Sequence, residues 1–282
     1  MTTSRRGFLG SMMAAGSVPG FSAFAAPAAI GGNAGDIKLG VATYSLREFS
    51  RAHAIRMMKQ LGVQYVSIKE FHLPVNSTPD ECRKGRAEFE KAGLTILSGG
   101  NVSFQINDEE DIRHRFEYAK NSGMPMIVCA PTHETLPKME KYVKEYNIKI
   151  AVHNHGPEDK HFPTPESVLD AVKNMDPRCG LCMDIGHSVR TGADIVEAIR
   201  KAGPRLLDMH VKDLKSTTDK NSQVAVGDGV LPFPALFTEL KKMNYQGGVM
   251  LEYEVEGDNP LPGMQKSFSY MRGVLAGLNF KG

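Results

Sequence analysis

The sequence has no surplus of charge of either sign. Lysine and arginine number 34 and aspartate and glutamate 32 among 282 residues. The first 35 residues contain Arg5, Arg6 and no acidic side chain, so 32 basic and 32 acidic side chains remain in the rest of the chain. A protein that binds nucleic acid through its phosphates needs an excess of basic residues. The balance therefore argues against a nucleic acid as partner.

Cysteines and long apolar runs are also scarce. The four cysteines are too few to staple a chain of 282 residues into a disulfide-dependent fold. Cys179 and Cys182 form a C-x-x-C, but Cys182 lies in an apolar run, where cysteine usually behaves as a small buried hydrophobic residue. Beyond the first 35 residues, no stretch approaches the roughly 20 uncharged residues of a membrane-spanning helix. We therefore expect no membrane association once a leader has been removed.

The N-terminal segment has the features of an export signal. Ser4-Arg5-Arg6-Gly7-Phe8-Leu9 precedes a stretch rich in Ala, Gly and Met, and Ala23-Phe24-Ala25 provides small residues for a cleavage site. Paired arginines followed by Phe-Leu favour a twin-arginine signal, which serves the export of folded proteins. We expect residues 1–35 to be a signal peptide and linker, residues 36–282 to form a single catalytic domain, and the mature protein to be periplasmic.

Short apolar runs alternate with longer amphipathic stretches through the rest of the chain. This alternation is typical of parallel strands connected by helices, and eight such units in about 245 residues predict an α/β fold of the (β/α)₈ TIM barrel type. A doubly wound sheet is the alternative, but the first run is followed by Thr43-Tyr44-Ser45-Leu46-Arg47 and by no glycine-rich phosphate loop. The expected strands are Ile37 to Thr43, Gln64 to Lys69, Leu94 to Ser98, Pro125 to Cys129, Ile148 to His153, Gly180 to Asp184, Leu206 to Val211 and Gly248 to Glu252.

Chemically reactive side chains gather where these runs end. Barrel enzymes carry their active sites at the carboxyl ends of the strands. Five of the nine histidines lie at such ends, and a histidine beside a buried sheet is costly unless it binds something. The segments concerned are Lys69-Glu70-Phe71-His72, His153-Asn154-His155, Asp184-Ile185-Gly186-His187, His210-Val211-Lys212-Asp213 and Glu252-Tyr253-Glu254.

Four of these side chains have the composition of a metal site. His153, Asp184, His210 and Glu252 end four successive strands, which are neighbours around the rim of a closed barrel. Two imidazoles and two carboxylates suit Mn, Zn, Co or Fe better than Ca or Mg. The sequence thus predicts one divalent metal ion at this rim.

The remaining side chains at the strand ends are candidates for substrate contact and proton transfer. A side chain two residues further along a strand points to the same side, which brings His155 and Glu254 to the mouth of the predicted metal site. We expect Glu70 and His187 nearby. The loop at Gly227-Asp228-Gly229 is interpreted as a turn whose glycine backbone could also approach a ligand.

Taken together, these motifs and the leader resemble the sugar phosphate isomerase/epimerase family of xylose isomerase-like TIM barrels. That family also includes ketose 3-epimerases, inosose dehydratases and AP endonucleases. The resemblance spans residues 37 to about 278 and implies the same four metal ligands. The motifs that carry it are Ile68-Lys69-Glu70, His153-Asn154-His155, Met183-Asp184-Ile185-Gly186-His187, His210-Val211-Lys212-Asp213, Gly227-Asp228-Gly229 and Leu251-Glu252-Tyr253-Glu254.

Two departures narrow what the resemblance implies. In the ketose 3-epimerases a Glu ends the fifth strand and pairs with the Glu of the eighth, whereas His153 stands here, which argues against symmetrical epimerisation by two carboxylates. The endonuclease branch needs further histidines for three zinc ions. Gly99-Gly100-Asn101 and residues 214–229 offer none, so a DNA-repair role is disfavoured.

The resemblance implies a metal-dependent sugar isomerase or epimerase that abstracts a proton beside the carbonyl of a keto sugar through a metal-stabilised enediolate. Alternatives are a lyase that eliminates from a 3-keto-glycoside, a metal-dependent hydrolase, and a sugar-binding barrel without activity. An exported protein would meet unphosphorylated carbohydrates. The sequence leaves the sugar, the metal and the oligomeric state open. The catalytic candidates are Glu252, Glu70, His155, Lys212 and Glu254, and the substrate-binding candidates are His187 and His72.

Overall fold

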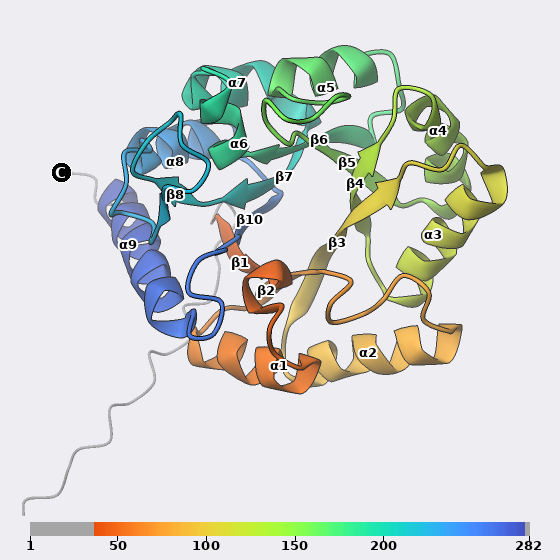
Figure 1. Ribbon diagram of the computed structural model, residues 1–282, viewed down its shortest axis with the longest axis horizontal. Helices are drawn as coiled ribbons and strands as arrows, with labels where there is room; N and C mark the ends of the chain where they lie inside the picture. The colour runs from red at the N-terminus through yellow and green to blue at the C-terminus, as the bar shows by residue number, and fades with distance from the viewer. Residues whose placement is uncertain (1–36, 280–282) are drawn as a thin grey trace, which may run out of the picture. The chain divides into compact units, whose positions relative to one another are not determined.

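The computed structural model describes residues 37–279, and the predicted leader with its paired arginines lies outside them. Eight parallel strands close into a barrel in the order β1-β10-β7-β6-β5-β4-β3-β2, as predicted (Figure 1). The strands are β1 Lys38–Ala42, β2 Tyr65–Ile68, β3 Thr95–Phe104, β4 Met126–Pro131, β5 Lys149–His153, β6 Cys179–Asp184, β7 Leu206–Val211 and β10 Gly248–Leu251.

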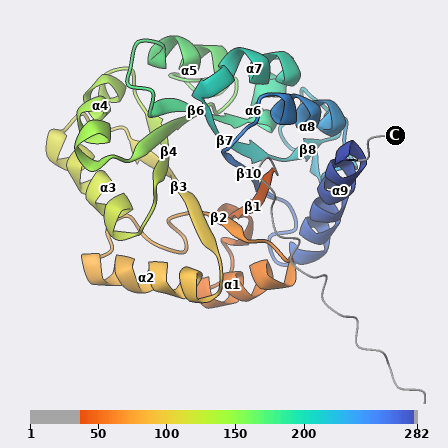
Figure 2. The ribbon, with the colours of Figure 1, turned by 180° about the vertical axis from the view of Figure 1, so that it is seen from behind.

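Helices form an outer ring around the barrel, which Figure 2 shows from behind. Thr78 and Thr164 cap α2 and α5, and a proline occupies the first turn of each of these two helices. The α-helices are α1 Arg51–Gln60, α2 Pro79–Lys91, α3 Glu109–Asn121, α4 Thr135–Tyr146, α5 Pro165–Val172, α6 Ile185–Arg190, α7 Ile195–Ala202, α8 Phe233–Lys242 and α9 Leu261–Asn279, and the 3₁₀ helices are η1 Thr43–Leu46 and η2 Gly203–Arg205.

The strands are apolar because the barrel interior covers one face and the helices cover the other. Every residue of β6 is buried, for example. The strand register brings the chemical residues to one level: His153 pairs with Cys182, and Asp184 pairs with His210. The amide of Glu252 donates to the carbonyl of Val211 at 2.9 Å and so continues the ladder by one residue.

Two segments differ from the sequence prediction. Strand β3 continues through Gly99 and Gly100 to Phe104, although the glycine pair predicted an end at Ser98. A β-carbon at Gly99 would lie 2.2 Å from the sulfur of Met124, so the glycine serves close packing and does not end the strand. The loop after β7 also contains a small antiparallel pair, β8 Asp213–Leu214 with β9 Gln223–Val224.

The four cysteines are unpaired and buried, as predicted for Cys182. Burial raises the pKa of the Cys182 thiol well above its ordinary value, which makes it a poor nucleophile. None of the helices within residues 37–279 has the length and apolar character required to cross a membrane.

Candidate metal centre and active site

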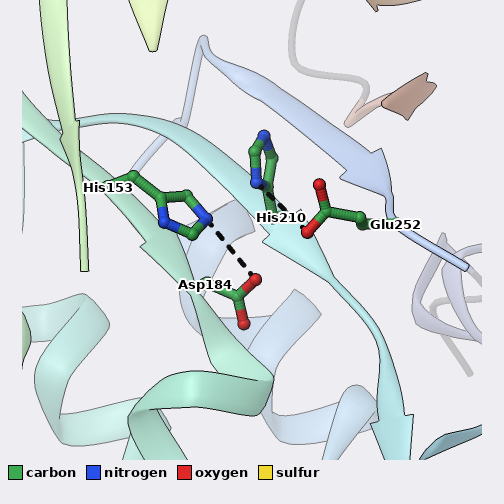
Figure 3. A group of neighbouring side chains, drawn as sticks. All are labelled: His153, Asp184, His210 and Glu252. Carbon is green, nitrogen blue, oxygen red and sulfur yellow. Dashed lines mark ion pairs between the residues drawn. The ribbon is translucent and has the colours of Figure 1, made fainter. Parts of the chain in front are cut away.

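Four side chains converge at the carboxyl end of the barrel (Figure 3). His153, Asp184 and His210 end or nearly end β5, β6 and β7, and Glu252 directly follows β10. Each contributes one potential ligand atom, and these atoms all lie within 4.8 Å of one another. His153 Nε2 lies 3.5 Å from Asp184 Oδ2, and His210 Nδ1 lies 3.6 Å from Glu252 Oε2. The structure thus brings together the four residues that the sequence predicted as ligands. We call these four side chains the metal cluster.

Several polar atoms of this cluster are buried without a hydrogen-bond partner. They are both ring nitrogens of His153, both ring nitrogens of His210, and Oδ2 of Asp184. An unpaired buried polar atom costs about 1–3 kcal/mol, so a cluster of them requires an explanation. Burial lowers the pKa of His210 well below its ordinary value, which keeps a ring lone pair free. A divalent cation would satisfy one nitrogen of each imidazole and Oδ2 of Asp184, so the residues fit a metal ion.

Two buried lysines neutralise the carboxylates. Lys212 Nζ lies 3.2 Å from Asp184 Oδ2 and 3.1 Å from Glu252 Oε2, and it also bonds to Glu254. Lys69 Nζ lies 3.2 Å from Glu252 Oε1. Burial opposes ionisation of Asp184 and Glu252, but the ammonium groups outweigh it and hold the pKa of each carboxyl well below its usual range. Both carboxylates are therefore ionised at neutral pH.

Hydrogen bonds from neighbouring loops fix the backbone of two ligands. Asn154 Oδ1 accepts a hydrogen bond from the amide of Asp184 at 3.0 Å. Gln223 donates to the carbonyl of Glu252 at 2.7 Å and accepts from the amide of Glu254 at 3.2 Å. Gln223 could not be singled out from the sequence, since a glutamine in a loop carries no signal of the strand end that it will contact.

The Gly227-Asp228-Gly229 loop is held from below by Asp213. The Asp213 carboxylate accepts hydrogen bonds from the amides of Gly227, Gly229 and Leu231 at 2.9 to 3.1 Å. A β-carbon at Gly229 would lie 2.1 Å from Asp213 Oδ1. The glycine therefore serves this loop anchor, and the turn interpretation of the motif is confirmed.

A pocket opens above the metal cluster, and it contains most of the predicted site residues. Its side chains are those of Tyr44, Lys69, Glu70, Phe71, Asn101, His153, His155, His187, Glu252 and Glu254. Lys212 is buried among the carboxylates and is not one of the lining residues. His72 points elsewhere, since its Nε2 lies 3.2 Å from the carbonyl oxygen of Phe49. The structure gives no support to His72 as a substrate contact, and we leave it out of the proposed site.

Four pocket residues were not among the candidates from the sequence: Tyr44, Lys69, Phe71 and Asn101. Asn101 Oδ1 is buried and unpaired, which makes it an acceptor for a ligand hydroxyl. Tyr44 and Phe71 form an edge-to-face pair with ring centroids 5.5 Å apart. Asn101 lies within β3, and the glycine pair before it obscured this position because the strand was expected to end at Ser98.

Two imidazoles line the pocket beside the metal cluster. The rings of His155 and His187 lie 4.4 Å apart between centroids. Burial lowers the pKa of His155, and burial lowers that of His187 to about 4. Both rings are therefore neutral at pH 7, and each offers one N–H donor and one acceptor nitrogen.

One further carboxyl lies inside the barrel, below His210. Asp208 is fully buried, and its Oδ2 accepts from the Ser98 hydroxyl at 2.6 Å. Burial raises the pKa of Asp208 to about 7. Between the ordinary carboxyl value near 4 and pH 7 the unfolded chain loses this proton and the folded chain keeps it, so stability falls as pH rises through that window.

We expect Asp208→Asn to remove this decline. The variant should match the wild type near pH 4 and should exceed its free energy of unfolding by roughly 2–4 kcal/mol at pH 8, since one pKa unit corresponds to about 1.4 kcal/mol. Urea denaturation of chelator-treated protein at both values of pH measures the difference. A difference that does not change with pH would show that Asp208 ionises normally in the folded protein.

Comparison with known proteins agrees with this architecture. A family model described as xylose isomerase-like TIM barrel matches residues 55–274. An inosose dehydratase of Mesomycoplasma hyopneumoniae is 27% identical over 281 aligned positions, covering 81% of this chain and 90% of its own. An uncharacterized protein of Methanocaldococcus jannaschii is 30% identical over 123 residues, and the chain spans only 41% of its length.

Solved structures share the fold at lower sequence identity. A 3-keto-D-glucoside 4-epimerase of E. coli superposes with a TM-score of 0.70 at 16% identity, covering 84% of this chain and all of the other. The IolI protein, solved with a bound zinc atom, superposes with a TM-score of 0.70 at 19% identity, covering 86% of this chain and 99% of the other. These likenesses confirm the fold.

Proposed function

The chain belongs to the xylose isomerase-like TIM barrel family, and we propose that it is a metal-dependent enzyme that removes a proton beside the carbonyl of an unphosphorylated keto sugar or keto-glycoside. One observation carries the proposal. Four buried ligand-type side chains, with ligand atoms within 4.8 Å of one another, lie under a pocket lined with carboxylates and imidazoles. The activities named for its relatives, inosose dehydratase and 3-keto-D-glucoside 4-epimerase, support an enzyme of the lyase or isomerase/epimerase type.

His153, Asp184, His210 and Glu252 would hold the ion. When bound, a divalent metal polarises a carbonyl oxygen and stabilises the negative charge that develops during proton removal. The two imidazoles and two carboxylates accommodate Mn, Zn, Co or Fe. The zinc atom of the IolI structure supports a metal of this kind.

Glu254 is our candidate for the base. Its carboxylate lines the pocket, is about one third exposed, and is held by Lys212, while its amide is fixed by Gln223. Glu70 lines the same pocket and is the second carboxylate candidate. Glu252 is less available, since it lies between Lys69 and Lys212 as part of the metal cluster.

His155 is our candidate for the group that returns the proton. Its imidazole is neutral at pH 7, so it can donate its N–H proton while the other ring nitrogen takes up a proton from solvent. A carboxylate base with an imidazole partner is an unequal pair. Such a pair fits isomerisation, or elimination in which the imidazole protonates a leaving oxygen, better than epimerisation through two matched carboxylates.

The pocket favours an uncharged substrate. Its lining includes one lysine, Lys69, and three glutamates, Glu70, Glu252 and Glu254. A phosphate group would meet three carboxylates and one ammonium group that is already paired with Glu252. We propose glycosides or free sugars as substrates and export to the periplasm, where such compounds are met; the arginine pair at residues 5 and 6 supports export.

A product assay distinguishes the possible outcomes. The purified protein, loaded with Mn, Zn, Co or Fe in turn, is incubated with a panel of keto sugars and 3-keto-glycosides, and the products are identified by NMR. We expect chelator-sensitive conversion by isomerisation or by loss of a β-substituent. Hydrolysis of a substrate without a carbonyl would favour a hydrolase, and unchanged substrates with tight binding would favour a sugar-binding barrel.

Glu254→Gln should keep the metal and lose proton transfer. The amide has the shape of the carboxylate but cannot take a proton, so we expect kcat to fall about 10²- to 10⁴-fold with metal content unchanged. Glu70→Gln is tested in parallel, and the larger loss identifies the base. The exposed Glu166 of α5 provides the control as Glu166→Gln. Loss of metal in either pocket variant would make that residue a ligand instead.

A further inference from the structure

A buried arginine contacts one of the pocket imidazoles from outside the pocket. The Arg190 side chain is 7% exposed, and its Nη2 lies 3.0 Å from Nδ1 of His187. The same guanidinium donates two hydrogen bonds of 2.7 Å to the two carboxylate oxygens of Glu158. Such a two-pronged pair holds the guanidinium in one orientation. The burial and the bidentate contact make this a fixed arrangement.

The arginine decides which nitrogen of His187 carries the proton. A guanidinium has donors and no acceptor, so Nδ1 of His187 must accept. The proton of the neutral ring then lies on Nε2. This nitrogen is 4.0 Å from Asp184 Oδ2, so the N–H side of the ring faces the metal cluster and the pocket.

Local backbone features leave room for this contact. Gly156 has φ of +85°, and a β-carbon there would lie 2.6 Å from Arg190 Nη2 and 3.2 Å from His187 Nδ1. Glu158 follows in the same loop, three residues after His155. His187 and Arg190 lie three residues apart on α6, hence on one face. Residues 155–158 and 187–190 thus contribute both imidazoles and the Arg190–Glu158 ion pair beside them.

Resting on the proposed function, we infer that Arg190, oriented by Glu158, is a positioning residue that fixes His187 as a neutral Nε2–H donor to the substrate oxygen beside the reacting carbon. With its lone pair engaged at Nδ1, His187 cannot accept a proton at the nitrogen that faces the pocket. The acid/base imidazole is then His155. The ligand group recognised at this point is a carbonyl or hydroxyl oxygen, which accepts a hydrogen bond.

The tautomer can be measured without any substrate. Protein labelled with ¹⁵N in its histidine rings is compared by NMR with His187→Ala to assign the signal. We expect the wild type to show a proton on Nε2 and none on Nδ1 of His187, and Arg190→Met to show a mixture of both forms. A proton on Nδ1 in the wild type would overturn the inference, whatever the activity of the protein.

Kinetics test whether Arg190 acts through His187. We expect Arg190→Met to lower kcat/KM about 10- to 100-fold with metal content unchanged, as partners that orient site residues typically do. Arg190→Lys should restore part of the loss. In a His187→Ala background the same change should have no further effect. An equal loss in both backgrounds, or loss of metal, would overturn the positioning role.

Two further variants guard against a folding artefact. Glu158→Gln removes a charge at a half-exposed position and should give a smaller loss in the same direction. Arg113→Met breaks the exposed pair with Glu145 and should leave kcat/KM unchanged. If the NMR result stands and no keto sugar reacts, the proposed function fails while the assigned tautomer holds.

Discussion

His210→Ala is expected to release the metal and abolish activity while the barrel stays folded. His210 is fully buried, and its Nδ1 lies beside Glu252 in the metal cluster. His210→Ala removes one of the four ligand side chains and leaves a buried space in its place, so we expect the metal content to fall from about one ion per chain to a trace. Metal analysis of the purified variant measures this directly.

The expected loss of activity in this variant is about 10³-fold or more. A bound cation contributes several kcal/mol to transition-state stabilisation, and each 1.4 kcal/mol is about tenfold in rate. Stability of the metal-free protein should change by only about 1–2 kcal/mol, because the ring nitrogens removed have no hydrogen-bond partner. The exposed His114 provides the control as His114→Ala. A fully active variant without metal would refute the site.

Lys212→Met is expected to destabilise the metal-free protein by about 3–5 kcal/mol at pH 7. The ammonium lies 3.2 Å from Asp184 and 3.1 Å from Glu252, and its removal leaves buried carboxylates without this partner. Bound metal would neutralise the same carboxylates, so the loss should be smaller in the loaded protein. Urea denaturation with and without chelator measures both values.

The stability difference between Lys212→Met and the wild type should depend on pH. Burial raises the pKa of Asp184 and Glu252, but the ammonium groups outweigh burial and depress both pKa values in the folded wild type. These carboxyls therefore contribute stability above the ordinary carboxyl value near 4, and that contribution is lost as pH falls through their folded pKa. The difference between wild type and variant should be largest at neutral pH and should shrink below about pH 4.

A surface pair provides the matched control for this lysine. Lys141 bonds to Glu109 at 2.7 Å, and both side chains are more than half exposed. Lys141→Met should cost less than about 1 kcal/mol, since solvent screens such pairs. Equal stability of Lys212→Met and the wild type at pH 7 would show that the buried carboxyls are not both ionised in the metal-free protein.

Much of the fold could be predicted because barrel strands are buried on both faces. Strand β7 runs from Leu206 to Val211, as its apolar run indicated. The end of strand β3 could not be predicted. Gly99 is required there because Met124 packs against it, and no local sequence pattern encodes that contact. Glycine looks the same in a sequence whether it ends a strand or makes room for a neighbour.

The convergence of His153, Asp184, His210 and Glu252 could be predicted because strand ends in a barrel share one rim. The same rule was wrong for His72, which lies beyond its strand: the amide of His72 donates to the carbonyl of Lys69, and the turn directs the ring toward Phe49. Gln223 and Arg190 escaped prediction because each acts through contacts between segments about 30 residues apart in the chain. Such roles depend on tertiary structure and have no periodic signal.

The most direct test of the central claim is proton exchange at a substrate carbon in heavy water. Metal-loaded protein is incubated with keto sugars and 3-keto-glycosides, and incorporation of deuterium is followed by NMR with and without a chelator. We predict exchange at a carbon beside the carbonyl that requires the metal and is lost in His210→Ala. Metal-loaded protein that binds a substrate and never exchanges this proton would contradict the proposed chemistry.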